Sequence, residues 1–452
     1  MPSNGTANGA SNGTTNGHSN GTAKSTSRKT SKDTPNGKVQ YSPAERAAEV
    51  AVSPNNAERV PSTIAAIQSI GDTFNAANND ARMKLLVEAR RLVQSLETPR
   101  ETMIKHNWAQ PAAHAAITLG VDTGLFKAML ANDASPKTVA KLSENVNVDA
   151  SLLARTMRHL AAMGYIRETA ADEYEPTNFS KSLAIPIIGD GYPCLAGGAN
   201  SSLLKLNTYA AKIGYREPTS SAHGPYQHAY DTHLNFFAYL QDNPPLGPQF
   251  NHHMAGYRQG RPSWMDENFF PVKERLIKGA KAEDDAALLV DIGGSIGHDI
   301  AEFARKHGNS AGRLVLQDLP AVLGQIDTLD ERIERMSYDF FTKQPLAGAR
   351  AYYMHSVLHD WPDDVCERIL ENVKDAMEPG YSKLLINENV IPDVQAHWEA
   401  TGLDLMMLAL FASRERTAAQ WKHLLEDRAG LRIVKIWEVG NGVESLIECE
   451  LP

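Results

Sequence analysis

A histidine in the stretch "SVLHDWPDD" is the first residue whose type and position suggest chemistry. His359 follows an apolar, aromatic run that predicts a buried strand, and Pro362 marks the start of a helix just after it. A neutral imidazole can take a proton from a weakly acidic hydroxyl, so His359 is a candidate general base. Two other interpretations stay open here: a metal ligand acting with His355 and Asp360, and a histidine that only fills space.

The metal interpretation has little support from the spacing. His355, His359 and Asp360 fall on a predicted strand and the turn after it, where alternating side chains do not converge on one point. The three cysteines are far apart and show no C-x-x-C spacing, which also argues against a structural zinc site or a disulfide framework. We therefore expect no metal and a reducing, cytoplasmic location.

A glycine-rich turn in "VDIGGSIGHD" predicts a cofactor site. Gly293 and Gly294 follow a predicted strand, and ligands of α/β sheets bind where such strands end. The stretch matches neither the dinucleotide pattern G-x-G-x-x-G nor a phosphate-binding P-loop. Asp291, directly before the glycines, favours S-adenosylmethionine, because that cofactor carries a cationic amino-acid end and no phosphate.

Two further strand ends carry residues that suit a nucleoside. Asp318 in "LQDLP", followed by Leu319, is placed to accept hydrogen bonds from ribose hydroxyls. Asp339 and Phe340 in "YDFF" could bind the edge of an adenine and cover its ring. Together with the glycine turn, these residues predict a site for S-adenosyl-L-methionine.

The elements that must position these residues alternate from about residue 286 onward. Strand and helix patterns succeed each other, and the chain ends in two strands joined near Asn441 and Gly442. This order predicts an α/β fold: a Rossmann-like domain with a mostly parallel, seven-stranded sheet and a C-terminal antiparallel hairpin. We assign it to 186–452, with a helical substrate-pocket segment at 186–280.

The N-terminal part predicts a different architecture. Residues 1–45 are rich in Asn, Gly, Ser and Thr and are expected to be a disordered arm. An amphipathic helix follows near 80–99, and then helices and a two-stranded wing, so 46–185 resembles an α-helical winged-helix domain. The net charge of -9 argues against nucleic acid and anionic membranes, and favours protein contact through the wing. No apolar stretch is long enough to span a membrane.

With these motifs in place, the chain resembles the plant-type small-molecule O-methyltransferases and, more closely, their fungal relatives. The resemblance covers roughly 60–452 and rests on VDIGGSIGHD, LQDLP, YDFF, HDWPDD, INENVIP and ASRERTAAQW. It implies a winged-helix dimerisation domain before the cofactor domain, and His359 as the base between Glu388 and Glu415. Ser295 replaces a glycine of many members. His355 replaces a lysine that lies near the cofactor in plant members, so we count it among the cofactor residues.

The resulting hypothesis is an S-adenosylmethionine-dependent O-methyltransferase that forms a homodimer. Its expected acceptor is a phenolic or enolic hydroxyl of a small aromatic, polyketide-type metabolite, held by Phe250, Asn251, Met254 and Asp360. Two alternatives remain. One is a methyltransferase-fold protein that uses the same cofactor for a pericyclic or dehydration reaction, and the other is a winged-helix regulator that binds DNA.

Overall fold

The protein, seen here as a computed structural model, forms two compact units, Met1–Asn107 and Trp108–Pro452. The structure describes residues 42–75, 78–257, 259–283, 285–308, 312–440 and 442–452. Most of the predicted disordered arm, 1–45, lies outside the described residues. Its last four residues are described, and 43–45 belong to helix α1 (Pro43–Val52), so the prediction of disorder is wrong for them. The boundary predicted at 185/186 does not coincide with the boundary between the two units.

The first unit is helical throughout its described part. After α1 come a 3-10 turn η1 (Ala57–Arg59), α2 (Val60–Gly71), α3 (Asn79–Leu96) and α4 (Pro99–Ile104). The amphipathic helix predicted near 80–99 is α3, whose start is capped by the Asn78 side chain. Thr98 forms a capping box with Glu101, which explains why α3 ends and α4 begins at this point. A π-helical turn η2 (Lys105–Ala109) runs across the unit boundary.

Apolar side chains of the first unit remain largely in contact with solvent. Among the side chains described between 42 and 107, only Thr63 and Ser95 are buried, and neither is apolar. Half or more of the side-chain surface is exposed for Val93 and Leu96 on α3 and for Met103 on α4. The helices of this unit therefore lack a hydrophobic core of their own within the described residues.

The second unit begins with a small helical module. It contains α5 (Gln110–Asp122), α6 (Leu125–Leu130), β1 (Lys137–Thr138), α7 (Val139–Val146), α8 (Ala150–Ala162), β2 (Ile166–Ala170) and β3 (Glu173–Pro176). The predicted wing has two strands, but the structure has three, in the order β1-β3-β2. Helix α7 starts at Val139, because Lys137 and Thr138 pair with β3 and the Thr138 side chain caps the helix.

Short helices then connect this module to the sheet. They are α9 (Asn178–Ser182), α10 (Pro186–Gly189), α11 (Gly191–Gly198), α12 (Asn200–Leu204), α13 (Leu206–Lys212), α14 (Pro225–Tyr230), α15 (Phe236–Asp242), α16 (Leu246–Tyr257) and the π-helical turn η3 (Lys273–Ile277). The double proline between α15 and α16 separates the two helices as predicted. Phe250, Asn251 and Met254 all lie on α16.

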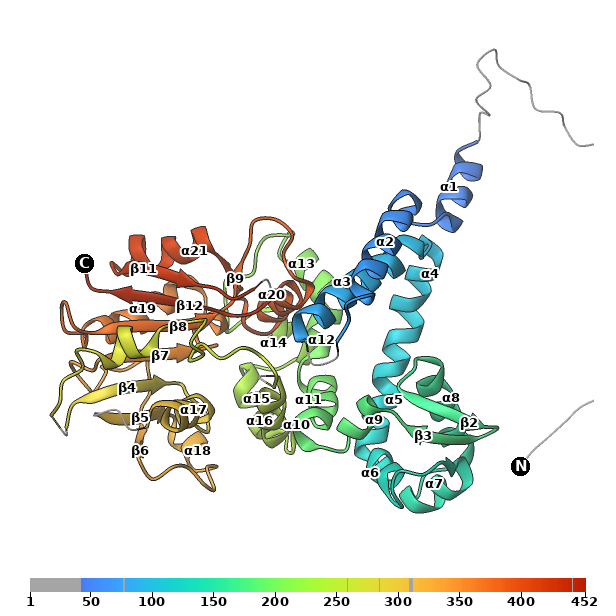
Figure 1. Cartoon of the computed structure of the whole chain (residues 1–452), viewed down its shortest axis with the longest axis horizontal. Helices are drawn as coiled ribbons and strands as arrows, with labels where there is room; N and C mark the ends of the chain where they lie inside the picture. The colour runs from blue at the N-terminus through green and yellow to red at the C-terminus, as the bar shows by residue number, and fades with distance from the viewer. Residues whose placement is uncertain (1–41, 76–77, 258, 284, 309–311, 441) are drawn as a thin grey trace, which may run out of the picture. The chain divides into compact units, whose positions relative to one another are not determined.

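A seven-stranded sheet forms the C-terminal part of the second unit, drawn in yellow to red in Figure 1. Its strands are β4 (Ala287–Ile292), β5 (Arg313–Asp318), β6 (Ile333–Ser337), β7 (Ala351–His355), β8 (Lys383–Glu388), β11 (Arg432–Trp437) and β12 (Ser445–Glu450). The order is β11-β12-β8-β7-β4-β5-β6, and β12 runs antiparallel to both of its neighbours. The predicted mostly parallel sheet of seven strands, with an antiparallel C-terminal hairpin, is confirmed.

Each face of the sheet carries its own apolar layer. Alternate residues such as Val290 and Leu384 face α19 (Asp363–Lys374), α21 (Ala418–Lys422) and the π-helical turn η5 (His423–Arg428). The residues between them, such as Leu289 and Leu385, face α17 (His298–His307) and η3. Strands β4 and β8 are buried along their whole length, as expected for parallel strands covered on both faces.

The remaining elements lie after the strand ends. They are α18 (Pro320–Leu323), the 3-10 turn η4 (Leu358–Asp360), β9 (Val390–Ile391), α20 (Trp398–Phe411) and β10 (Arg416–Thr417). Within the described residues, no helix has both the length and the apolarity needed to cross a bilayer.

Candidate active site

The turn that carries His359 places its ring between two carboxylates. His359 is the central residue of η4, directly after β7, and only 7% of its surface is exposed. Its Nδ1 lies 2.7 Å from Oε1 of Glu415, a hydrogen-bond distance, and its Nε2 lies 3.5 Å from Oδ1 of Asp360. A carboxylate on Nδ1 fixes the tautomer that leaves Nε2 free to accept a proton, which is the geometry of a general base.

Glu388 supports the same turn through the backbone instead of the ring. Its Oε1 accepts hydrogen bonds from the amide groups of Val357, Leu358 and His359, at 3.2, 2.7 and 3.3 Å. These amides lie at the start of η4, where backbone donors have no partner within the helix. Of the two acids expected to flank His359, Glu415 therefore bonds the ring, whereas Glu388 holds the turn.

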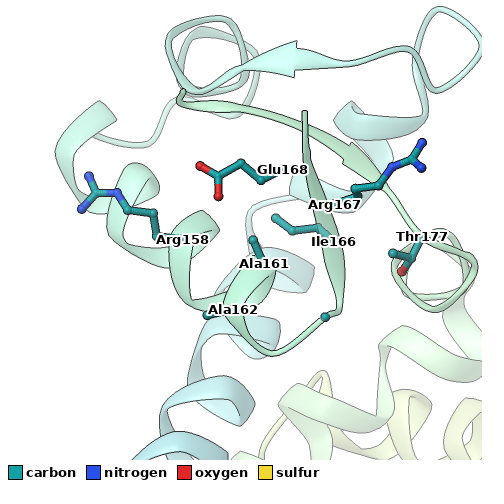
Figure 2. A pocket seen from close by; sticks show the side chains of 8 residues that line it. Arg158, Ala161, Ala162, Ile166, Arg167, Glu168 and Thr177 are labelled. Carbon is teal, nitrogen blue, oxygen red and sulfur yellow. The ribbon is translucent and has the colours of Figure 1, made fainter. Parts of the chain in front are cut away.

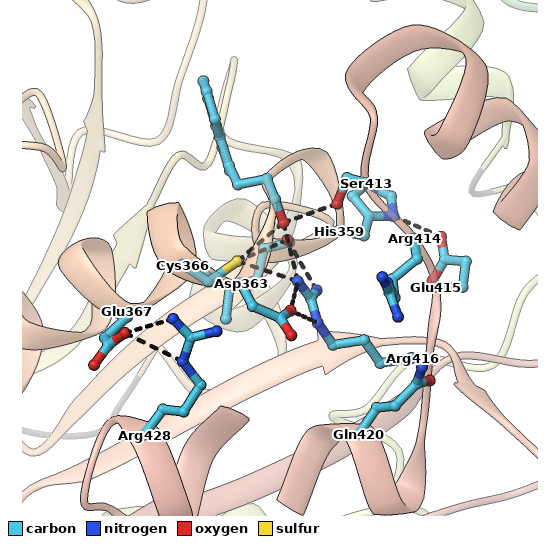
Figure 3. Close-up of polar contacts among 12 residues, drawn as sticks. His359, Asp363, Cys366, Glu367, Ser413, Arg414, Glu415, Arg416, Gln420 and Arg428 are labelled. Carbon is cyan, nitrogen blue, oxygen red and sulfur yellow. Dashed lines mark hydrogen bonds and ion pairs between the residues drawn. The ribbon is translucent and has the colours of Figure 1, made fainter. Parts of the chain in front are cut away.

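A buried arginine missed in the sequence clamps this turn from the other side (Figure 3). The Arg416 guanidinium donates to the backbone oxygens of Leu358 and Trp361, at 3.1 and 2.9 Å, and to the Asp363 carboxylate at 2.7 Å. Parallel pairing of β10 with β9 sets Arg416 opposite Val390, close to the end of the strand that carries Glu388. The "RERT" stretch thus supplies both the partner of the histidine ring and the support of its backbone.

Buried charges shift the protonation equilibria of this cluster. Burial disfavours the charged imidazole, but Glu415, Asp360 and Glu388 outweigh it and raise the pKa of His359 to about 10. Burial, together with the neighbouring Glu388 and Glu415, raises the pKa of Asp360 to about 7 against the opposing effect of His359. Burial also raises the pKa of Glu388. The cluster therefore stabilises an imidazolium, the form in which a base is left after taking a proton.

His359, Glu388 and Glu415 also lie close enough together to resemble a set of metal ligands. One atom each of His359, Glu388 and Glu415 lies within 4.8 Å of the others. In this structure, however, Oε1 of Glu388 and Oε1 of Glu415 already bind the backbone and the ring of the histidine. Our expectation of metal-free chemistry stays a prediction, which chelation tests below.

The glycine turn after β4 forms a closely packed cradle. Gly293 has φ +70°, a conformation that L-residues with side chains rarely adopt, and a Cβ there would lie 2.9 Å from Val357. A Cβ on Gly294 would lie 2.5 Å from the Asp291 carboxyl carbon. Glycine is therefore needed at both positions for the turn to pack against Val357 and Asp291, and the turn lies after β4, where ligands of α/β sheets bind. Ser295 adopts φ +54° without a glycine.

The residues predicted to contact a nucleoside lie after two adjoining strands, β5 and β6. The Asp318 carboxylate accepts hydrogen bonds from the amides of Ser295, at 2.8 Å, and Leu319, at 2.7 Å, which ties it to the glycine turn. Burial raises the pKa of Asp318 despite these bonds, so hydroxyl donors of a ribose would relieve the cost of its charge. Asp339 follows β6, and the Phe340 ring lies near Gly293, where it can cover a planar base.

His355 belongs to a polar network that the sequence did not reveal. Its Nδ1 lies 2.6 Å from Oδ2 of Asp299, in the first turn of α17, and its Nε2 lies 3.2 Å from Oε2 of Glu444. Glu444 also accepts a hydrogen bond from the Tyr257 hydroxyl and lies 3.9 Å from Nη1 of Arg261. Both ring nitrogens of His355 thus have carboxylate partners. Any effect of His355 on cofactor binding therefore acts through this network.

The predicted pocket residues on α16 have different surroundings. Phe250 is partly buried and packs edge-on against Phe236 in an aromatic cluster with α15 and α20. Asn251 donates a hydrogen bond of 2.6 Å to Gln325, just beyond α18, and so links α16 to the region after Asp318. Met254 is partly buried. Asp360 is the member of the predicted pocket set that lies beside His359.

The helical module at the start of the second unit carries a separate hollow of about 450 Å³ (Figure 2). Arg158, Arg167 and Glu168 line it, together with the end of α8. Nε2 of His159, also on α8, lies 2.9 Å from the backbone oxygen of Ala109. An acidic residue at the hollow and an internal contact for His159 both disfavour nucleic acid as a partner.

Comparison with known proteins identifies the family to which the chain is similar. The model of the O-methyltransferase domain family matches residues 222–432, which include the glycine turn and the His359 cluster. The chain is 37% identical to the O-methyltransferase mfmE of Annulohypoxylon moriforme over 401 residues, 88% of this chain and 98% of that protein. It is 36% identical to the O-methyltransferase mpaG of Penicillium brevicompactum over 392 residues, 86% of this chain and 98% of that protein.

Solved structures show the same architecture with the expected cofactor. LepI in complex with S-adenosylmethionine has a TM-score of 0.77 and 28% identity, covering 88% of this chain and 100% of that one. Another structure, described as a pericyclic reaction enzyme, has a TM-score of 0.78 and 28% identity, covering 87% of this chain and all of that one. OxaC bound to S-adenosylhomocysteine and oxaline has a TM-score of 0.77 and 25% identity, covering 87% of this chain and 99% of that one.

Proposed function

The chain belongs to the S-adenosylmethionine-dependent O-methyltransferase family of fungal secondary metabolism, and we propose that it methylates a phenolic or enolic hydroxyl of a small aromatic, polyketide-type metabolite. The observation that carries this proposal is the His359 ring, held at Nδ1 by Glu415, with Nε2 on the side of Asp360. A phenol has a pKa of about 10, so it needs a base at neutral pH before it can attack a methyl group.

In the proposed mechanism, the protein positions the acceptor and receives its proton. S-adenosylmethionine, when bound, supplies an electrophilic methyl group on a sulfonium. The glycine turn with Asp291, Asp318, Asp339 and Phe340 holds the cofactor at the strand ends, while Nε2 of His359 takes the hydroxyl proton. Glu415 stabilises the resulting imidazolium, and Glu388 with Arg416 keeps the turn in place. Phe250, Asn251, Met254 and Asp360 are the proposed surroundings of the acceptor.

Methyl-labelled cofactor and a panel of phenols test the assignment. Orcinol, 2-naphthol and larger phenolic polyketides are incubated with the protein, and labelled ethers are identified by mass. We expect label in at least one phenol and its loss in His359→Gln. Pre-treatment with EDTA should leave the rate unchanged, because no step requires a metal; a lost rate that Zn²⁺ or Mg²⁺ restores would overturn the metal-free mechanism.

A second candidate function deserves the same assay because of the structural neighbours. The protein resembles a pericyclic reaction enzyme about as closely as it resembles OxaC. A pericyclic or dehydration reaction would convert a substrate without transferring label, and S-adenosylhomocysteine would not accumulate. The pairing of His359 with Glu415 favours methyl transfer, since it leaves Nε2 as a proton acceptor, which that reaction needs in every cycle.

We further propose that the chain functions as a homodimer joined through its N-terminal half. The support is the exposed apolar surface of the first unit, above all Val93 and Leu96 on α3, and Leu152 on α8 in the second unit. Met157 and Leu160, also on α8, are fully buried in the core of their own module and are not part of this surface. Light scattering that reports a monomer at micromolar concentration would contradict the proposal.

A further inference from the structure

Asp360 lies beside the one ring nitrogen of His359 that Glu415 does not bind. Its Oδ1 is 3.5 Å from Nε2, whereas Oε1 of Glu415 is 2.7 Å from Nδ1. The exposed fraction of the side chain is 15% for Asp360, 9% for His359 and 0% for Glu415. Among these three groups, Asp360 has the most contact with solvent.

Each methylation releases one proton that must leave this buried site. The oxygen–carbon bond forms, the carbon–sulfur bond breaks with its electron pair going to sulfur, and the hydroxyl proton goes to Nε2 of His359. Before the next cycle, Nε2 must lose this proton to water. The route through Nδ1 is closed, because Glu415 is shielded from solvent and its amide is bonded to Asp404.

We propose that Asp360 is a proton-relay residue, which accepts the proton from Nε2 of His359 and passes it to water. In this step the Nε2–H bond breaks, an O–H bond forms on the Asp360 carboxylate, and that proton then transfers to solvent or buffer. The step needs no other reactant. It rests on the proposed role of His359 as the base.

The electrostatic surroundings suit a relay. Burial, Glu388 and Glu415 raise the pKa of Asp360 to about 7, which brings its carboxyl group closer in proton affinity to His359, whose pKa is about 10, than an ordinary carboxyl group would be. Transfer from Nε2 to Asp360 is still uphill, and release of the proton from Asp360 to water or buffer near neutral pH completes the step. The charged groups that face His359 or its partners come from several elements. They are Glu388 at the end of β8, Asp404 on α20, Glu415 and Arg416 around β10, and Glu444 before β12.

The exchange of the His359 Nε2 proton with water tests the relay without any acceptor. Protein labelled with ¹⁵N-histidine is studied by NMR at pH 6, where the imidazolium is populated, and the exchange rate is measured for the wild type and Asp360→Asn. We expect exchange to slow by about 10-fold or more in Asp360→Asn, since general acid–base groups contribute on the order of 10²–10⁴-fold. Asp364→Asn changes an exposed carboxylate in the next helix and should leave the rate unchanged. Equal rates in Asp360→Asn and the wild type would overturn the proposal.

Turnover provides a second, independent measurement. Using 2-naphthol, or the panel phenol that is methylated fastest, rapid quenching of Asp360→Asn should show later cycles that are slowed more than the first turnover, which itself falls somewhat because Asp360 belongs to the proposed surroundings of the acceptor. Added imidazole buffer should speed the later cycles of Asp360→Asn, and Asp360→Glu should restore them. A first turnover slowed as much as the later cycles would mean that Asp360 only shapes the site. Wild-type turnover in His359→Gln would instead refute the proposed function, whatever the exchange rates show.

Discussion

The N-terminal helices and the seven-stranded sheet differ in how far their apolar side chains are buried. Among the side chains described between 42 and 107, none that is apolar is buried, whereas every residue of β4 and β8 is buried. Burial of apolar surface is the main favourable term in folding, at roughly 25 cal/mol per Å². The sheet gains this free energy by burying its apolar side chains within one chain. The N-terminal helices would gain much of it only by burying their apolar side chains against another surface.

The same contrast extends to polar groups. In the sheet region, buried charges such as Glu415, Arg416 and Glu444 meet partners that come from distant parts of the same chain. In the N-terminal helices, the ion pairs are local, such as Arg91 with Glu88 one turn away. The buried charges of the sheet region are therefore paired within one chain, while the N-terminal region keeps exposed apolar surface that the proposed dimer would cover.

The largest effect should be the loss of turnover in His359→Gln. This variant should affect the chemistry of the sheet region and leave the N-terminal helices unchanged. Glutamine keeps a polar side chain but cannot take the proton, so turnover should fall by about 10²–10⁴-fold. Calorimetric affinity for S-adenosylhomocysteine and the dimer should both stay close to those of the wild type, because His359 lies outside the glycine turn and the first unit. A variant with more than half the wild-type rate would refute the assignment.

The next effect concerns the apolar face of the N-terminal helices. Val93→Asp with Leu96→Asp places two charges on exposed apolar positions of α3, which should weaken dimerisation by about 100-fold, since an interface anchor typically contributes more than about 1 kcal/mol. Analytical ultracentrifugation measures the dissociation constant. Gln94→Asp adds a charge on the same helix at a polar position and serves as the control. An unchanged dimer in the double variant would place the interface elsewhere.

A smaller effect is expected at the cofactor site of the sheet region. Asp318→Ala removes the carboxylate that binds the glycine turn and would accept the ribose hydroxyls. Hydrogen bonds to charged groups contribute roughly 1.5–3 kcal/mol each, so affinity for S-adenosylhomocysteine should fall by about 10- to 100-fold. Isothermal titration calorimetry provides the measurement, and Asp318→Asn, which keeps one acceptor, should lose less. Unchanged affinity would mean that Asp318 does not contact the cofactor.

Local patterns predicted the sheet well because its central strands β4, β7 and β8 carry runs of apolar or aromatic residues. The same patterns missed β1, since Lys137 and Thr138 are too few to show a period and owe their pairing to β3. The partnership of His359 with Glu415 came from family resemblance, because 56 residues separate the two. The backbone contacts of Arg416 could not be predicted from the sequence, since they depend on where distant carbonyl groups lie after folding.

The smallest expected effect tests how much a paired buried charge in the sheet region, Glu444, contributes to the stability of the protein. Although Glu444 is buried, His355 and Arg261 lower its pKa to about 2. A carboxyl group whose pKa is lower in the folded state stabilises the protein above its unfolded value, and this stabilisation is lost as the pH falls toward the folded value. The loss for Glu444 should therefore begin below about pH 4.5 and amount to about 1 kcal/mol per pH unit.

Urea unfolding between pH 6.5 and 3.5 measures this contribution. The free energy of unfolding of Glu444→Gln should be lower than that of the wild type at pH 6.5, and the difference should shrink by about 1 kcal/mol at pH 3.5, because glutamine does not titrate. Glu399→Gln removes an exposed partner of the same arginine and should run parallel to the wild type, since solvent screens that pair. If the Glu444→Gln curve also ran parallel to the wild type, the network of His355, Glu444 and Arg261 would contribute nothing to folding through its charge.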